Sequence, residues 1–152
     1  MIASTIWKEL KSTLENNPTL KDYVKVVFSG IRFKLEPDSL PCIMLEPVID
    51  NEIETDLNQI KRQWLSIDVF AYSDYNVTDF DKTIVGGRDY KGVLDIANDI
   101  RACLQSSNTL GDNVYDIQFE PTEFARIDDD EKYPVRVLVI PIKILYQQNK
   151  GV

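Results

Sequence analysis

The residues with which proteins perform acid–base or metal chemistry are sparse in this chain. Histidine is absent from its 152 residues, which removes the commonest general base near neutral pH and every Ser-His-Asp or Cys-His scheme. Two cysteines, Cys42 and Cys103, have neither the spacing of a metal site nor the number for a disulfide framework. We interpret both as buried free thiols and predict a protein that is not an enzyme and holds no metal or cofactor.

Two short segments invite a chemical interpretation. The segment 86–89, Gly-Gly-Arg-Asp, is a glycine pair before a predicted helix, where an anion can bind. The longer GxxxxGK and GxGxxG patterns are missing, which favours a flexible loop end. The acidic run 128–131 lacks the ligand spacing of an EF-hand loop and indicates a polar turn. A pair of carboxylates that meet in space, as in glycosidases, stays open, because the sequence picks out no pair.

The charge and hydropathy of the chain limit the kinds of partner that it can bind. A formal net charge of −8 argues against a general binder of nucleic acid or anionic membranes, since such proteins depend on clustered Lys and Arg. Lys61-Arg62 is the one adjacent basic pair. Charged residues interrupt the segment 1–14, and no apolar run reaches 18 residues, so we expect a soluble protein made in the cytoplasm, without a signal peptide.

The first half of the chain predicts one helix and three strands. Apolar residues recur every fourth position from Ile2 to Leu14, which predicts an amphipathic helix over residues 4–16 that Pro18 ends. Strands are expected over 23–28, 42–46 and 63–72, with an acidic loop over 48–59. In the third strand, aliphatic residues alternate with a second face formed by Trp64, Ser66, Asp68, Phe70 and Tyr72. Both faces carry large side chains, so we expect a helix or another subunit to cover the second face.

The second half predicts a long connection, a helix and a long hairpin. The connection over 73–89 is apolar enough to become ordered on a partner surface. An i, i+3, i+4 pattern predicts a helix over 89–106. The hairpin joins 114–127 to 135–146, and its second arm would span about 40 Å, so part of it is expected to pair outside the domain or to project. Pro141 within that arm indicates an edge strand, a bulge or a change of partner.

These elements predict one α+β domain over residues 1–152. Its order is α-β-β-β-α-β-β, with a mostly antiparallel sheet, two amphipathic helices and the long C-terminal hairpin. Residues 147–152 are expected to form a frayed tail.

Several of these segments together resemble a known family. Leu-Pro-Cys-Ile-Met-Leu-Glu-Pro at 40–47, Leu-Ser-Ile-Asp-Val-Phe-Ala-Tyr-Ser at 65–73, the helix at 90–104 and the closing hairpin resemble the tail terminator proteins of long-tailed bacteriophages, also called tail completion or tail-to-head joining proteins. The resemblance covers most of the chain and depends on size, element order and the two strand patterns. The loops at 48–59 and 73–89 look longer than the family's minimum.

The resemblance implies a structural virion protein that forms a ring, typically a hexamer. The ring caps the growing tail tube, stops its polymerisation and presents a surface to the head connector. The implied partners are further copies of the chain, the tail tube protein and a head–tail connector or stopper protein, with DNA only as passing cargo and no membrane. Its implied location is the virion tail, assembled in the host cytoplasm.

A ring with a DNA channel gives the acidic and apolar segments possible roles. Acidic residues would suit the lumen, because a wall that attracted phosphates would stall the DNA; solvated loops kept soluble by charge are the alternative. The candidate lumen-facing residues are Asp50, Glu52, Glu54, Asp56, Asp128, Asp129, Asp130 and Glu131. The candidate subunit-interface residues are Tyr75, Phe80, Ile84, Leu138, Ile140, Ile142 and Ile144.

Two other classes stay open. One is another component of a virion joint, such as a head–tail stopper or a baseplate adaptor. The less favoured one is a small enzyme or ligand-binding α+β domain with a carboxylate and tyrosine site. A tail tube gene immediately downstream would support the terminator, and a stable monomer with a deep polar pocket would favour the enzyme.

Overall fold

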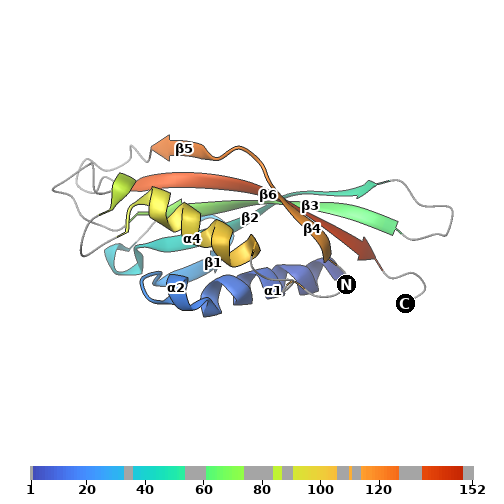
Figure 1. Ribbon diagram of the computed structural model, residues 1–152, viewed down its shortest axis with the longest axis horizontal. Coiled ribbons are helices and arrows are strands. Elements are labelled where there is room, and N and C mark those ends of the chain that lie inside the picture. Colours follow the sequence, from blue (N-terminus) through green and yellow to red (C-terminus); the bar gives the residue numbers. More distant parts are fainter. Residues whose placement is uncertain are drawn as a thin grey trace.

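The computed structural model of the chain describes residues 2–32, 36–53, 61–73, 84–86, 91–105, 110, 114–126 and 135–148. In these residues, helices lie on one face of a mixed sheet (Figure 1), which confirms the predicted α+β class. The elements are α1 (Ile2–Asn16), α2 (Pro18–Lys21), β1 (Val26–Ser29), the 3₁₀ turn η1 (Pro37–Ser39), β2 (Cys42–Ile53), β3 (Lys61–Tyr72), α4 (Val93–Gln105), β4 (Val114–Phe119), β5 (Glu123–Arg126) and β6 (Arg136–Gln148).

The sheet has the strand order β1-β2-β3-β6-β4, and β5 also pairs with β6. Among the described strand pairs, β1–β2 is parallel, and the pairs β2–β3, β3–β6, β4–β6 and β5–β6 are antiparallel, in line with the mostly antiparallel sheet expected. β3 is the middle strand of this order, and β6 is also internal, because β3 pairs along one of its sides while β4 and β5 pair along the other. The longest strands of the sequence are therefore its central ones.

The first helix ends as predicted, but Pro18 also begins a second one. The Asn17 side chain accepts hydrogen bonds from the backbone N–H groups of Thr19 and Leu20, each at 3.1 Å, and so caps α2. Pro18 occupies the first turn, where its missing N–H removes no hydrogen bond. This short turn lets Leu20 extend the buried face that α1 begins.

The predicted acidic loop over 48–59 is wrong for its first half. β2 continues to Ile53 and pairs with β3 from Cys42↔Tyr72 to Ile53↔Arg62, with a bulge between Pro47 and Ile49. Backbone pairing with a long neighbouring strand overrides the weak strand propensity of the acidic residues. Residues 54–59 lie outside the described part of the chain.

The C-terminal hairpin differs from the prediction in both arms. Its first arm consists of two strands, β4 and β5, and its second arm pairs inside its own sheet, from Lys61↔Gln148 to Tyr72↔Val137. The part of β6 expected to project thus lies against β3, which has 12 residues to the 13 of β6. Pro141 lies where β6 changes partner from β4 to β5, and its carbonyl accepts a hydrogen bond from the N–H of Glu120 at 2.9 Å. This confirms the change of partner among the three alternatives for Pro141.

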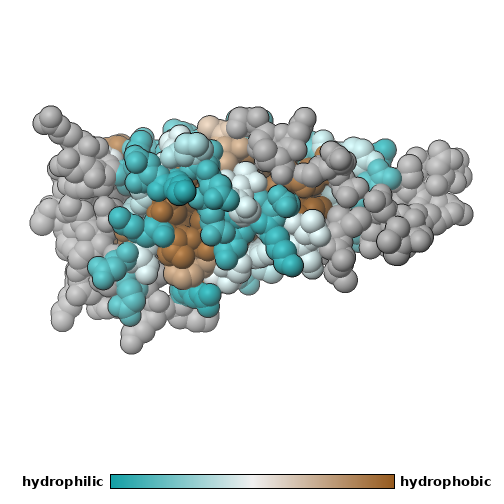
Figure 2. Space-filling model, turned by 90° about the horizontal axis from the view of Figure 1, so that it is seen from below, coloured by the Kyte–Doolittle hydropathy of each residue, from teal (hydrophilic) through white to brown (hydrophobic). Residues whose placement is uncertain are grey.

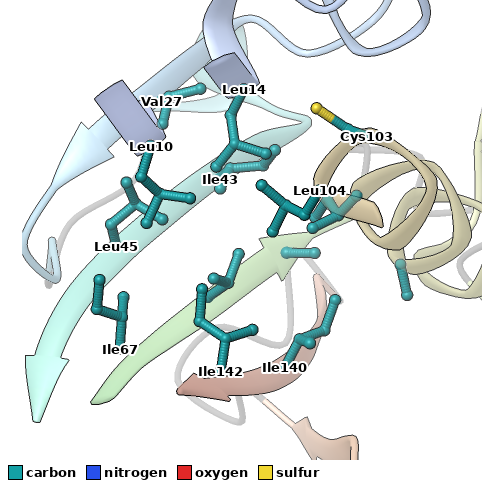
Figure 3. Packing of buried hydrophobic residues seen from close by; sticks show 14 of the residues in the cluster. Leu10, Leu14, Val27, Ile43, Leu45, Ile67, Cys103, Leu104, Ile140 and Ile142 are labelled. Carbon is teal, nitrogen blue, oxygen red and sulfur yellow. The ribbon is translucent and has the colours of Figure 1, made fainter. Parts of the chain in front are cut away.

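The main hydrophobic core lies between the sheet and its helices. Leu10 and Leu14 of α1 face Ile43 and Leu45 of β2, with Leu104 of α4 beside them (Figure 3). From below, where α1 and α2 lie in Figure 1, hydrophilic residues cover much of the described surface, with separate hydrophobic patches between them (Figure 2). The helices therefore shield one face of the sheet and present a largely polar surface to solvent.

Helix α4 begins later than the sequence predicts. The carbonyl of Gly92 accepts the first hydrogen bond of the helix, from the N–H of Ile96 at 3.1 Å. A Cβ atom at position 92 would lie 2.3 Å from the carbonyl oxygen of Ile84, so the segment 84–86 packs directly on this glycine. The buried face of α4 consists of Val93, Ile96, Ala97, Ile100, Cys103 and Leu104.

Candidate functional site

The described residues show no cluster of side chains that could bind a metal ion. Within the described ranges, no three His, Cys, Asp or Glu side chains are grouped as metal ligands. No helix in that part of the chain is long and apolar enough to cross a bilayer. The feature that calls for a function is instead the face of the sheet on which no described helix packs, which we call the open face.

The open face consists of the side chains that alternate with the core residues along each strand. β3 contributes Trp64, Ser66, Asp68 and Phe70, all half-buried, and the buried Tyr72. β6 contributes alternate residues from Val137 to Gln147. The two large faces of β3 are confirmed. No helix in the described part of the chain packs on the second face, and its cover by another subunit stays a prediction.

A second, smaller apolar cluster covers one end of the open face. It consists of Leu40, Cys42, Met44, Tyr72, Val135 and Val137, with Val26, Phe28 and Phe70 packed against it. The chain after β1 closes over this end, because the N–H of Arg32 donates to the Met44 sulfur at 3.3 Å and the Arg32 guanidinium lies 5.2 Å from the Phe28 ring. This end is therefore part of the fold, and the open surface begins beyond it.

Carboxylates cross the middle of the open face. Glu46 pairs opposite Asp68, and Glu123 approaches Asp68 from β5. Burial, followed by the negative charges of Glu123 and Glu46, raises the pKa of Asp68. The negative charge of Glu46 is partly compensated, because its Oε2 accepts a hydrogen bond from the backbone N–H of Ile31 at 3.0 Å. The repulsion at Asp68 is a local cost that a positively charged partner group would relieve.

Polar and aromatic groups occupy the far end of the open face. Lys143 forms an ion pair with Glu120 at 3.2 Å. The Arg62 guanidinium lies 5.3 Å from the ring centre of Tyr115, whose hydroxyl donates to Gln147 Oε1. Tyr115 is nevertheless 50% exposed. Aromatic and arginine side chains of this kind are the residues that protein–protein interfaces enrich.

The two cysteines are buried free thiols, as interpreted from the sequence. Burial raises the pKa of Cys42 to about 12. Burial also raises the pKa of Cys103, against a smaller opposing effect of a hydrogen bond with Asn17. A raised pKa keeps a thiol protonated and unreactive, so both side chains act as core residues.

The predicted interface residues of β6 have a different place in the structure. Leu138, Ile140, Ile142 and Ile144 are at most 1% exposed and lie in the main core beneath the helices. Because this chain's own side chains already cover them, they have no surface to offer a neighbouring subunit. Ile84 is half-buried beside Gly92, while Tyr75 and Phe80 lie outside the described residues.

The predicted acidic lumen residues are mostly outside the described part of the chain. Asp50 and Glu52 are residues of strand β2. The others, Glu54, Asp56, Asp128, Asp129, Asp130 and Glu131, are outside the described residues. The acidic pair that the structure does bring together, Glu46 and Asp68, was missed because it depends on the register between two strands. The alternation of each strand alone could have placed both on the open face.

The comparisons with known proteins give a likeness among solved structures. No protein-family model and no curated protein sequence matches the chain. Among solved structures 30 chains match, and one of them belongs to the "Virion of native gene transfer agent (GTA) particle". That chain aligns with a TM-score of 0.58 and 9% identity over 97% of this chain and 98% of its own length. At such low identity the likeness establishes a shared fold.

Proposed function

We propose that this chain is a structural protein of a phage-like virion and, more specifically, a tail terminator. In this role identical copies close into a ring, typically a hexamer. The ring caps the tail tube, ends its polymerisation and joins the tail to the head connector. The protein would be assembled in the host cytoplasm and carried in the virion tail. No step in this role requires a catalytic residue, a metal or a cofactor.

The observation that carries the proposal is the end-to-end likeness to a virion chain. The alignment covers 97% of one chain and 98% of the other, so it involves the complete arrangement of helices and sheet rather than one common motif. The strand patterns at 40–47 and 65–73, which resemble the tail terminator family, support the more specific role from the sequence alone. Both patterns lie in β2 and β3, which form the centre of the matched fold.

The surface properties of the described residues fit an assembly role. Trp64 and Tyr115 place aromatic area on the open face, and the half-buried Asp68 is available to a basic group. A terminator needs one surface that matches a tube subunit and another that lacks the half needed for further growth. A helix layer on one side and an open face on the other supply two unlike surfaces.

The first test is the mass of the purified protein. Six copies of the 17.5-kDa chain would give a particle of about 105 kDa in light scattering, and negative-stain images would show rings. We expect this ring with the protein alone or on addition of the tail tube protein from the same genome. A monomer at every concentration, with or without tube protein, would contradict the proposal.

The second test separates a terminator from another virion joint component. Deleting the gene should leave tail tubes of unregulated length if the protein terminates the tube. If it is instead a head–tail stopper or a baseplate adaptor, tubes of normal length should accumulate without heads or without baseplates. Electron micrographs of the deletion lysate distinguish these outcomes, and a copy of the gene supplied in trans is the control.

A further inference from the structure

Two strand edges are open at the same end of the sheet. β1 pairs with β2 only over Cys42–Leu45, so no described strand pairs with the outer edge of β2 beyond that point. On the opposite side, the described strands leave the outer edge of β4 without a partner. Open edges present N–H and C=O groups that can pair with a strand of another chain.

The register places these two edges level with each other. Asp50 of β2 pairs with Leu65, Leu65 with Ile144, and Ile144 with Ile117 of β4. The adjacent rows connect Ile49 to Gln118 and Asn51 to Asp116 in the same way. Residues 49–52 and 114–118 therefore lie at the same height on the two sides of a four-stranded band.

The strand directions match for a ring. β2, β3, β6 and β4 alternate in direction, because each neighbouring pair is antiparallel. A copy generated by rotation about an axis along the strands keeps the same orientation, so its β2 runs opposite to β4 of the first copy. The contact would continue the antiparallel alternation from one copy to the next, as a head-to-tail ring requires.

Local features limit where the β2 edge can pair. The carbonyl of Leu45 accepts a hydrogen bond from the N–H of Gly30 at 2.6 Å, which shows that Leu45 turns its backbone groups to the outer side. Pro47, two residues later, has the same orientation and has no N–H to donate. Pro47 and the following bulge therefore end the protected part of the edge and leave 49–53 for pairing.

The outer edge of β4 has suitable groups. The N–H of Glu120 points to β6, where it donates to the carbonyl of Pro141. Backbone groups alternate sides along a strand, so Ile117 and Phe119 direct their N–H and C=O groups outward. Their side chains stay partly buried against the main core, which holds this edge in place.

We propose that copies of this chain join head to tail as an antiparallel strand pair between the outer edge of β4 (114–119) and residues 49–53 of β2 in the next copy. The inference rests on the proposed ring and names the contact that closes it. β1 at one end of β2 confines the contact to the opposite end of the sheet.

The test is intermolecular disulfide formation between matched cysteine variants. One preparation carries Gln118→Cys, and others carry Ile49→Cys, Asp50→Cys or Asn51→Cys, so that the scan covers a shift in register. Paired strands bring Cα atoms to about 5 Å, within the range that a disulfide spans. The native Cys42 and Cys103 are buried and contribute little background. Glu9→Cys, exposed on α1, is the control partner for Gln118→Cys.

We expect at least one scanned position to form a covalent dimer with Gln118→Cys, about tenfold or more above the Glu9→Cys control, because an interface raises the local thiol concentration. Light scattering and circular dichroism follow each variant. Rings without any scanned cross-link would overturn the inference and leave the proposed function standing. Cross-links between two Gln118→Cys copies alone would indicate a two-fold β4–β4 contact and would also overturn it. The absence of rings and cross-links together would contradict both.

Discussion

The two faces of the sheet come from the same strands and have opposite characters. Along β3, Ile67 and Val69 are fully buried under the helices, while Trp64 and Phe70 on the other face are only half-buried. The first face has the uniform aliphatic packing of a core. The second combines aromatic residues, facing carboxylates and an ion pair, a composition that suits contact with another protein. The difference suggests that one face specifies the fold and the other is available for assembly.

The largest effect should come from truncating the core face. Ile140→Ala removes a fully buried side chain, and we expect a loss of about 2–5 kcal/mol in the free energy of unfolding. The matched variant is Val139→Ala on the open face, where the side chain is half-buried and the loss should be about 1 kcal/mol. Urea denaturation compares the two. Equal losses would mean that the two faces do not differ as described.

A smaller loss is expected where a loop packs on the helix side. Gly92→Ala would place a Cβ atom 2.3 Å from the carbonyl oxygen of Ile84, so the segment 84–86 must move, at a cost of about 1–3 kcal/mol. Gln105→Ala, at an exposed position of α4, is the control and should change stability little. Thermal unfolding measures both. A stabilised Gly92→Ala variant would show that this contact is absent in solution.

The next effect concerns the hydrogen bond that joins Tyr23, in the segment after α2, to Asp99 of α4. The Tyr23 hydroxyl donates to Asp99 Oδ2 at 2.7 Å, and Tyr23→Phe should cost about 1–2 kcal/mol. Burial, followed by this hydrogen bond, raises the pKa of Tyr23 above its ordinary 10.0. The neutral phenol therefore contributes stability that is present below pH 10 and is lost as the pH rises beyond it.

The pH dependence of Tyr23 gives the same prediction a second readout. The parent protein should lose more stability than Tyr23→Phe when the pH is raised from about 9 to about 11. Tyr72 and Cys42 titrate in both proteins and cancel from the comparison. Parallel stability curves for the two proteins would mean that Tyr23 is not held beside Asp99.

The smallest effect, of opposite sign, is expected on the open face. The raised pKa of Asp68 means that its charged form is disfavoured in the folded state. Its stabilising influence is present below pH 3.8 and is lost as the pH rises through its folded pKa. Asp68→Asn should therefore increase stability at pH 7, by less than about 1 kcal/mol because solvent screens the partly exposed carboxylate. The gain should vanish near pH 3.

The control for this charge effect is Asp116→Asn, at an exposed position of the same face where the register places Leu145 opposite it. Urea midpoints at the two pH values measure both variants. A loss of stability for Asp68→Asn at pH 7 would show that its carboxylate makes a favourable contact, against the repulsion inferred from Glu46 and Glu123.

Local sequence patterns predicted the helices and strands whose apolar residues recur with a regular period. The fourfold spacing from Ile2 to Leu14 identified a helix and its buried side, and the alternation of β3 identified a strand with two large faces, because both depend on a residue's own neighbours. The second half of β2 was missed, since acidic residues there form a strand only through pairing with β3. Leu138 and its neighbours were assigned to a subunit interface, whereas they lie in the main core. Alternation shows that two faces exist, but the helices determine which one is core.

The sequence could predict which β3 side chains share the open face, but not which residues of other strands lie beside them. Trp64, Ser66, Asp68 and Phe70 could be assigned to one face from β3 alone. The approach of Glu123 to Asp68 and of Arg62 to Tyr115 depends on strand order across the sheet. Single-strand periodicity contains no information about that order, and the family resemblance named no contact residues.

The most direct test of the central claim is tail tube assembly in vitro, with the tube protein of the same genome and increasing amounts of this chain. The proposed role predicts that tubes become shorter as the chain is added and that a ring is visible at one end of each stopped tube in electron micrographs. Unchanged tube lengths and bare tube ends in the presence of the folded chain would contradict it.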